Sequence, residues 1–170
     1  FKVYAGYTSH MDYSVGRLIE TLKIINQLEN TIIVFASDNG AETTDQTHDT
    51  NLYPGRQERR PRTGSNYPLR GHKGQLYEGG IRTPAVIYWP GHFENKKLEE
   101  PINISDWMPT FASLLNIKFD NDPQWDGENI LPVIEKKKSI ADEKVIYWNL
   151  RHQRFAIRKG NWKLIVRELE

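Results

Sequence analysis

The sequence contains no cysteine, no long apolar run and no excess of one charge. Without cysteine, its 170 residues can form no disulfide, no thiolate metal site and no cysteine nucleophile. No apolar run approaches the roughly 18 residues that cross a bilayer, and the mean hydropathy is −0.68, so we predict no membrane span. The 23 basic and 22 acidic side chains balance, so nothing indicates a nucleic-acid partner or an anionic membrane surface.

The length of the chain is enough for one domain with a sizeable hydrophobic core. The chain starts at Phe1 rather than at a methionine, and no charged and then apolar leader follows. We therefore expect an internal piece of a longer protein, and a processed, mature domain is the alternative. The lack of cysteine leaves the cellular compartment open.

The first half of the sequence passes from a helical pattern to strand patterns. Apolar residues recur every three or four positions over residues 4–28, which predicts an amphipathic helix. The run Thr31–Ala36 predicts a strand covered on both faces, and Pro84–Trp89 predicts a second buried strand. A helix followed by a buried strand is typical of an α/β fold with a mostly parallel sheet and helices on its faces.

The second half of the sequence shows shorter elements. Ser105 is expected to cap a helix that runs through Leu115, and residues 127–135 favour one more short helix. Short strands with a tight turn at Lys159–Asn161 then predict an antiparallel sheet that begins a second subdomain. These strands are expected over residues 145–148, 155–157 and 162–166.

Two oxygen-bearing side chains, Asp38 and Asn39, follow directly after the first predicted strand. Open α/β sheets hold their ligands at the carboxyl ends of strands. A carboxylate beside an amide suits a hard cation such as Ca²⁺ or Mg²⁺, and an Asn in place of a His favours one such ion over a pair of transition metals. The alternative is a plain turn, because Asp-Asn-Gly is also good turn chemistry.

A lysine flanked by glycines is the second candidate for the site. Lys73 lies between Gly71 and Gly74, so the backbone can approach a tetrahedral anion while the ammonium acts as a point charge. Such a charge stabilises a transition state in a site that excludes water. The adjacent His72 is a candidate donor to a substrate. The alternative for Lys73 is an exposed loop lysine, which is the commoner role.

Residues 41–68 contain almost nothing apolar and form an unusually long loop for a compact domain. We expect this loop either to lie over the site or to be a plain solvated insertion. Arg56 is the first of four arginines that could contact an anionic, hydroxyl-rich ligand, the others being Arg59, Arg60 and Arg62. For Arg70, just beyond the loop, a structural ion pair with Glu78 is favoured over anion binding.

Five blocks of the sequence, in order, resemble the sulfatase family of the alkaline-phosphatase-like superfamily. They are Met11–Gly16, Ser37–Gly40, Pro68–Gly74 with Glu78–Pro84, Ser105–Thr110, and Ala156–Leu164. The resemblance implies an alkaline-phosphatase-like α/β fold, which is a mixed, mostly parallel sheet flanked by helices and followed by a small antiparallel C-terminal subdomain. Residues 1–140 would then be the C-terminal part of the catalytic domain, and residues 141–170 would begin the subdomain.

The resemblance also implies roles for the candidate residues. Asp38 and Asn39 would coordinate Ca²⁺, or Mg²⁺, and Lys73 would contact the sulfate group in catalysis. His72 and Arg56 are further candidates for substrate binding. The family's nucleophile is a formylglycine made from Cys or Ser in a Cys/Ser-x-Pro/Ala-x-Arg motif, which this sequence lacks. We therefore expect the upstream half of the same polypeptide to supply the nucleophile and this chain alone to be inactive.

The function implied by the resemblance is sulfuric ester hydrolysis by the longer protein. The expected substrate is a sulfated small molecule or glycan, above all a carbohydrate, because the polar loop suits one. Family members work mostly in periplasmic, secreted or lysosomal settings, so we expect an extracytoplasmic location. One alternative is a phosphoesterase or phosphonate hydrolase of the same superfamily, many of which carry His in place of Asn39 and bind two transition metals. The other is a non-catalytic binder of sulfated glycans.

Overall fold

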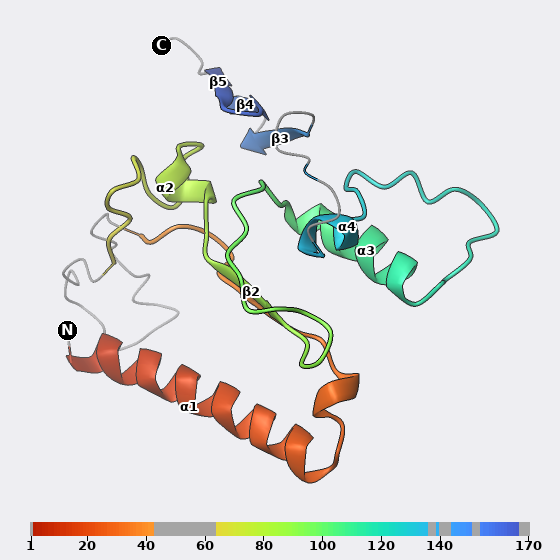
Figure 1. Ribbon diagram of the computed structural model, residues 1–170. Helices are drawn as coiled ribbons and strands as arrows, with labels where there is room; N and C mark the ends of the chain where they lie inside the picture. The colour runs from red at the N-terminus through yellow and green to blue at the C-terminus, as the bar shows by residue number, and fades with distance from the viewer. Residues whose placement is uncertain (1, 43–63, 136–138, 140–143, 151–153, 167–170) are drawn as a thin grey trace, which may run out of the picture. The chain divides into compact units, whose positions relative to one another are not determined.

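The computed structural model describes residues 2–42, 64–135, 139, 144–150 and 154–166 (Figure 1). The chain divides into two compact units, Phe1–Gly91 and His92–Glu170, and we describe each by itself. This division reflects packing inside the chain. The boundary at residue 140, which separates the expected catalytic domain from the expected subdomain, stays a prediction.

The first unit opens with the long helix α1 (Lys2–Ile24), which confirms the helix predicted over residues 4–28. The helix stops earlier than predicted because Asn26 takes a left-handed φ of 54°. There the Gln27 N–H donates to the Leu22 carbonyl at 2.8 Å, as in a Schellman cap. No residue of α1 is buried. Within the described residues, no helix combines the length and the apolar character of a membrane span.

Two strands follow, β1 (Ile33–Ala36) and β2 (Ala85–Tyr88), where Thr31–Ala36 and Pro84–Trp89 were predicted to be strands. A 3₁₀ turn, η1 (Leu28–Asn30), precedes β1. The strands pair in antiparallel direction, so the first residue of β1 lies opposite the last residue of β2. Figure 1 shows β1 in orange alongside β2 in green.

The burial predicted for both strands was wrong within this chain. Phe35 is 43% exposed and Val86 is 60% exposed. Among the described residues no third strand joins the pair, and a two-stranded ribbon leaves its faces open. The two strands run in opposite directions, which a mixed sheet allows. The reason is that the chain returns to the end of β1 before β2 begins. Just beyond β1, the Gly40 N–H donates to the Gly80 carbonyl at 2.9 Å, so β2 starts where β1 ends and runs back along it.

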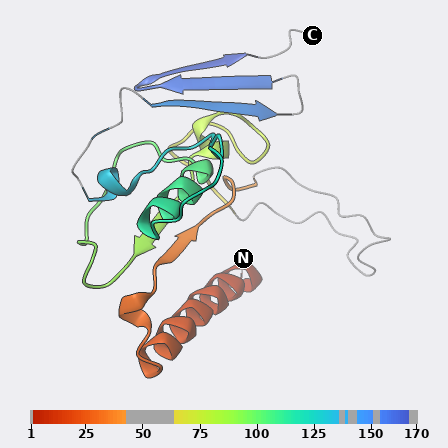
Figure 2. The same cartoon turned by 90° about the vertical axis from the view of Figure 1, so that its right-hand side faces the viewer.

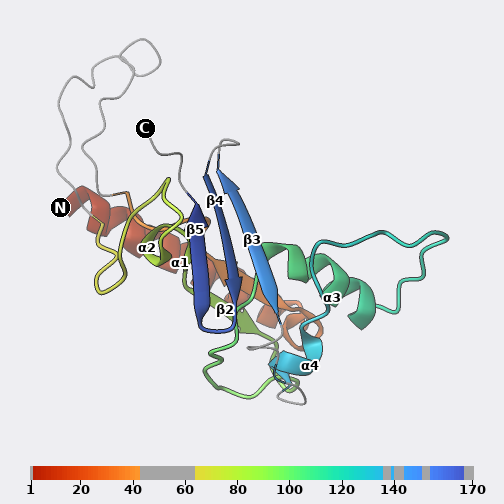
Figure 3. The same ribbon diagram turned by 90° about the horizontal axis from the view of Figure 1, so that it is seen from above.

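The described residues of the second unit form three short helical elements and one sheet. The helical elements are η2 (Ile104–Asp106), α3 (Trp107–Leu114) and α4 (Leu131–Ile134). The strands are β3 (Val145–Leu150), β4 (Arg154–Lys159) and β5 (Trp162–Val166). They form an antiparallel sheet in the order β3-β4-β5, and Figures 2 and 3 show them side by side. The predicted turn at Lys159–Asn161 is confirmed, and Gly160 takes a left-handed φ of 54° there.

The cap of the first helical segment in this unit is Asn103, and the prediction of Ser105 was wrong. The Asn103 side chain accepts a hydrogen bond from the Ser105 N–H at 3.2 Å, and the Asp106 carboxylate accepts one from the Asn103 N–H at 2.6 Å. These reciprocal bonds form a capping box. Ser105 lies inside the 3₁₀ turn, where its hydroxyl donates to Asn103 Oδ1 at 3.3 Å.

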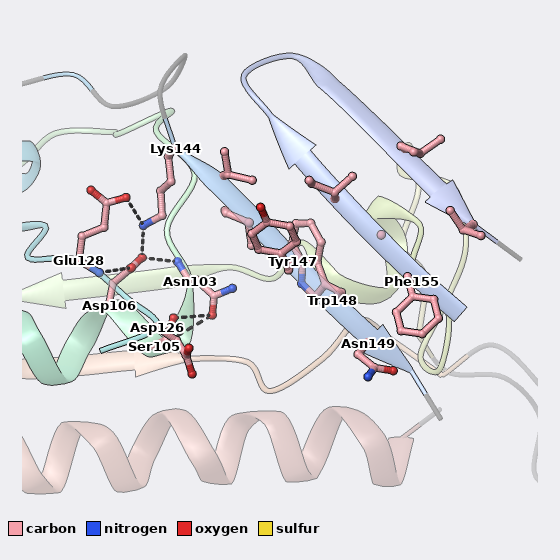
Figure 4. A pocket seen from close by; sticks show the side chains of 16 residues that line it. Asn103, Ser105, Asp106, Asp126, Glu128, Lys144, Tyr147, Trp148, Asn149 and Phe155 are labelled. Carbon is pink, nitrogen blue, oxygen red and sulfur yellow. Dashed lines mark hydrogen bonds and ion pairs between the residues drawn. The ribbon is translucent and has the colours of Figure 1, made fainter. Parts of the chain in front are cut away.

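The buried carboxylate of Asp106 organises the second unit (Figure 4). Besides its bond in the cap, it accepts from the Glu128 N–H at 3.1 Å and pairs with the Lys144 ammonium. Asp106 is 0% exposed and Lys144 is 6% exposed, so the ion pair is shielded from solvent. The Thr110 hydroxyl donates to the Asp106 carbonyl at 2.6 Å and accepts from the Ile130 N–H at 3.0 Å. The network ties the start of α3 to the segment before α4 and to β3.

Candidate functional site

The chain beyond β1 forms a turn, Ser37–Ala41, which we call the strand end. Asp38 Oδ1 accepts from the Asn39 N–H at 2.9 Å, and the Ser37 hydroxyl donates to the Asn39 carbonyl at 3.0 Å. Asn39 Nδ2 donates to the Gly40 carbonyl at 3.1 Å. These bonds do not use Asp38 Oδ2 or Asn39 Oδ1. From the sequence, a plain turn and a cation site were alternative interpretations of Asp38 and Asn39. The turn observed here leaves one oxygen of each side chain outside these bonds, so the two interpretations are compatible.

Glycines let three segments of the first unit meet backbone to backbone. A Cβ on Gly40 would lie 1.7 Å from the Gly79 carbonyl oxygen, and a Cβ on Gly79 would lie 2.3 Å from the Gly71 carbonyl oxygen. Real Cβ atoms do not approach an oxygen so closely, so only glycine fits at these crossings. Gly79 belongs to the short helix α2 (Glu78–Ile81), which thus packs between the strand end and the loop that carries Lys73.

The segment Gly71–Gly74, which we call the lysine loop, is shaped by its two glycines. Gly71 has a φ of 91° and Gly74 a φ of 79°, both in the left-handed region that favours glycine. Between them, the Lys73 N–H donates to the Ala41 carbonyl at 3.2 Å, and the Lys73 residue is exposed. The structure therefore brings the lysine loop against the strand end, two residues beyond Asn39.

The neighbours of Lys73 are held by contacts within the same unit. His72 Nδ1 lies 2.9 Å from the Lys73 carbonyl and 3.9 Å from Glu42 Oε1. Because Nδ1 donates to that carbonyl, Nε2 is the ring nitrogen that remains for a substrate. The Arg70 guanidinium carbon lies 4.0 Å from the centre of the Tyr77 ring, a cation–π contact. The ion pair expected between Arg70 and Glu78 stays a prediction.

A residue missed by the sequence reasoning, Asn66, bridges the two segments. Its side-chain amide accepts from the Ala41 N–H and donates to the carbonyls of Ala41 and Gly71. Asparagine often replaces a backbone partner in this way, because its amide has the same donor and acceptor groups as a peptide bond. The sequence feature that could have indicated this role is an asparagine in a polar segment, two residues before the block that begins at Pro68.

The donor set at the strand end fits part of a hard-cation site. Asp38 offers one carboxylate oxygen and Asn39 one amide oxygen, and Ca²⁺ takes about six to eight oxygen ligands. Within the described residues, no group of three or more His, Asp or Glu side chains could hold a metal ion. A complete coordination shell would therefore need ligands in addition to Asp38 and Asn39.

A cavity of about 710 Å³ lies in the second unit, along the sheet and the turn that holds Asp106 (Figure 4). Lys144, Tyr147 and Phe155 are among its lining residues, and none of the residues predicted for the site lines it. Arg56 falls in residues 43–63, outside the described part of the chain, as do Arg59, Arg60 and Arg62. Their contact with a substrate stays a prediction.

The profile of the Sulfatase family matches residues 1–117, and the chain belongs to this family. It is 30% identical to steryl-sulfatase of Homo sapiens over 146 residues, and this match covers 85% of this chain and 24% of that protein. It is also 30% identical over 146 residues to N-acetylgalactosamine-6-sulfatase of Mus musculus, with 85% of this chain and 25% of that protein covered. The chain thus spans about a quarter of the length of these curated relatives.

The same likeness extends to solved structures. The crystal structure of Ps i-CgsB matches with a TM-score of 0.76 and 36% identity, over 95% of this chain and 33% of that chain. The alkaline-phosphatase-like α/β fold class predicted from the sequence is thereby confirmed. The small antiparallel sheet predicted near the C-terminal end is present as β3-β4-β5, and its place after a catalytic domain stays a prediction.

Proposed function

We propose that this chain is part of a sulfuric ester hydrolase that removes sulfate from a sulfated substrate. Membership of the Sulfatase family supports this function. The observation that carries it is the hydrogen bond from the Lys73 N–H to the Ala41 carbonyl, because it draws the lysine loop to the strand end. Two candidate ligands for a cation and one candidate for an oxyanion then share one region of the first unit.

Each candidate residue has a proposed role in this reaction. Asp38 and Asn39 hold one Ca²⁺, or Mg²⁺, through their carboxylate and amide oxygens. When bound, the cation supplies positive charge beside the oxygens of the sulfate ester. The Lys73 ammonium contacts the sulfuryl oxygens and offsets the negative charge that develops as the ester bond breaks. His72, through Nε2, and Arg56 contact the substrate.

The nucleophile of the proposed enzyme lies outside this chain. The chain covers 24% of steryl-sulfatase, and it contains no Cys or Ser followed by the x-Pro/Ala-x-Arg pattern. The upstream half of the same polypeptide supplies the formylglycine and the remaining ligands of the cation. Residues 1–140 form the C-terminal part of the catalytic domain, and residues 141–170 begin the small antiparallel subdomain.

The proposed substrate is a sulfated carbohydrate. The name of the mouse relative specifies a sulfated amino sugar, although that of the human relative specifies a steryl sulfate. Of these two ligands, the sulfated sugar is the hydroxyl-rich one, and the polar segment 41–68 with its four arginines favours it. We further propose an extracytoplasmic location, periplasmic, secreted or lysosomal, as for most sulfatases.

The test of this function compares the 170-residue chain with the full-length protein that contains it. Both are purified and assayed with an aryl sulfate and with sulfated sugars. We expect turnover by the full-length protein and none by the chain, which contributes two cation ligands and no nucleophile. Turnover by the isolated chain would contradict the proposed division of the site. No turnover of any sulfate ester by the full-length protein would contradict the hydrolase itself.

Metal analysis of the full-length protein separates the sulfatase from the phosphoesterase alternative. We expect one Ca²⁺ or Mg²⁺ per chain, lost in Asp38→Asn because one charged ligand is removed. The matched control is Asp126→Asn, an exposed acid of the second unit, which should keep full occupancy. Two zinc ions per chain would favour the phosphoesterase, and equal occupancy in both variants would contradict the role of Asp38.

A further inference from the structure

Within the part of the chain that the structure describes, the side chain of Asn66 makes three hydrogen bonds, all to the backbone of the candidate site. The Ala41 N–H donates to Asn66 Oδ1 at 2.7 Å, and Asn66 Nδ2 donates to the Ala41 carbonyl at 2.9 Å. Nδ2 also donates to the Gly71 carbonyl at 3.1 Å. Ala41 lies two residues after the candidate ligand Asn39, and Gly71 lies two residues before Lys73. One side chain therefore joins the strand end to the lysine loop.

The strand end and the lysine loop each have supports besides Asn66. The strand end continues from the β1–β2 ladder, and the Ser37 N–H donates to the Pro84 carbonyl at 3.2 Å. In the lysine loop the Gln75 N–H donates to the His72 carbonyl at 3.0 Å, and the glycines at both ends take a left-handed φ. Such a segment is shaped by the groups that hold it in place. Loss of the Asn66 amide should therefore weaken the link between the lysine loop and the strand end.

We propose that Asn66 is a positioning residue of the sulfatase, which sets where the Lys73 ammonium lies relative to Asp38 and Asn39. This inference rests on the proposed function. Asn66 acts through the loop backbone, since the bonds of its amide to the described residues all go to main-chain groups. Displacements of about 1 Å can lower a rate by about 10²-fold when a catalytic group loses its geometry.

The test is a double-mutant cycle in the full-length protein, with an aryl sulfate as the substrate. Asn66→Asp keeps the shape and one acceptor but loses both donations, and Asn66→Ala removes the side chain. We expect each to lower kcat by on the order of 10²-fold. In the Lys73→Ala background the same substitutions should change kcat by no more than about twofold, the scatter expected of independent measurements. A merely structural role would lower activity equally in both backgrounds.

A matched control separates positioning from general loss of stability. Asn103→Ala removes another asparagine that bonds backbone groups, in the second unit and outside the set of residues proposed for the site. We expect it to lower Tm while the kcat of the folded fraction stays at the wild-type value. Hydrogen exchange of the Lys73 amide in the wild-type full-length protein needs no variant, and we expect that amide to be protected.

Each outcome decides a separate point. Wild-type kcat in Asn66→Asp, with kcat impaired in Lys73→Ala, overturns the positioning role and leaves the proposed function in place. The positioning role is also overturned if the Asn66 substitutions lower kcat as much in the Lys73→Ala background as in the wild type. If both Asn66 variants fail to fold, rapid hydrogen exchange of the Lys73 amide in the wild-type protein overturns it. Wild-type kcat in Lys73→Ala instead overturns the role proposed for the lysine.

Discussion

Each unit of this chain contains an important aspartate and lysine, and the two pairs differ in solvent exposure and in how they are held together. Asp106 is 0% exposed and Lys144 is 6% exposed, and their charges neutralise each other inside the second unit. Asp38 and Lys73 are both exposed, and backbone bonds hold their segments together in the first unit. The comparison teaches that a buried and paired acid holds the fold, whereas an exposed acid on a braced turn remains available to a ligand.

The largest effect should come from breaking the buried pair. Asp106→Asn leaves the buried Lys144 ammonium with only the half-exposed Glu128 carboxylate, 4.0 Å away, as a counter-charge. Breaking a buried ion pair in this way costs about 3–5 kcal/mol of folding free energy. The same change at the exposed site, Asp38→Asn, should alter stability by less than about 0.5 kcal/mol. Urea unfolding gives the free energy of unfolding of each variant, and the two losses relative to the wild type are compared. Equal losses of stability would remove the physical contrast between the two acids.

The next effect concerns activity rather than stability. Lys73→Ala in the full-length protein should raise the barrier by about 3 kcal/mol, or lower kcat on the order of 10²-fold, because a charge that stabilises the transition state is lost. Its unfolding free energy should barely change, since the residue is exposed. Lys118→Ala, at an exposed lysine of the second unit, is the matched control and should keep wild-type kcat. Near-normal activity in Lys73→Ala would count against the assigned role.

The smallest effects test the glycine crossings. In Gly40→Ala the new Cβ would lie 1.7 Å from the Gly79 carbonyl oxygen, so we expect a loss of about 1–3 kcal/mol from overpacking. Gly16→Ala, in α1 with nothing within 4 Å of its Cβ, should instead gain up to about 1 kcal/mol of helix stability. Thermal unfolding of the two variants gives opposite signs if the crossing is as tight as described. Equal shifts would show that the backbones at Gly40 can separate.

Several elements could be predicted because their signals are local. The spacing of apolar residues along α1 and the tight turn at Lys159–Asn161 depend on neighbours in sequence, and both were confirmed. The cap at Asn103 was missed because Ser105 is an equally good capping residue by type. The Asn103 N–H donates to the Asp106 carboxylate, and this reciprocal bond of the capping box identifies Asn103 as the cap.

The candidate site divides in the same way. Asp38, Asn39 and Lys73 stood out because carboxylate, amide and glycine-flanked ammonium are recognisable in sequence. Asn66 did not, because its value lies in three bonds to backbone groups, two of them 25 residues away. The burial of β1 was wrong because a run of apolar residues indicates a strand but not what covers it.

The sequence by itself determined the family, the class of fold and the residue types available for chemistry, since these follow from composition and from ordered local motifs. Only the tertiary structure decided which aspartate is buried and paired and which is exposed, and which asparagine joins the strand end to the lysine loop. The physical reason is that burial and hydrogen-bond partners depend on groups distant in sequence. Asp106 and Lys144 are 38 residues apart, and the strand end and the lysine loop meet where the backbones cross at Gly40, Gly79 and Gly71.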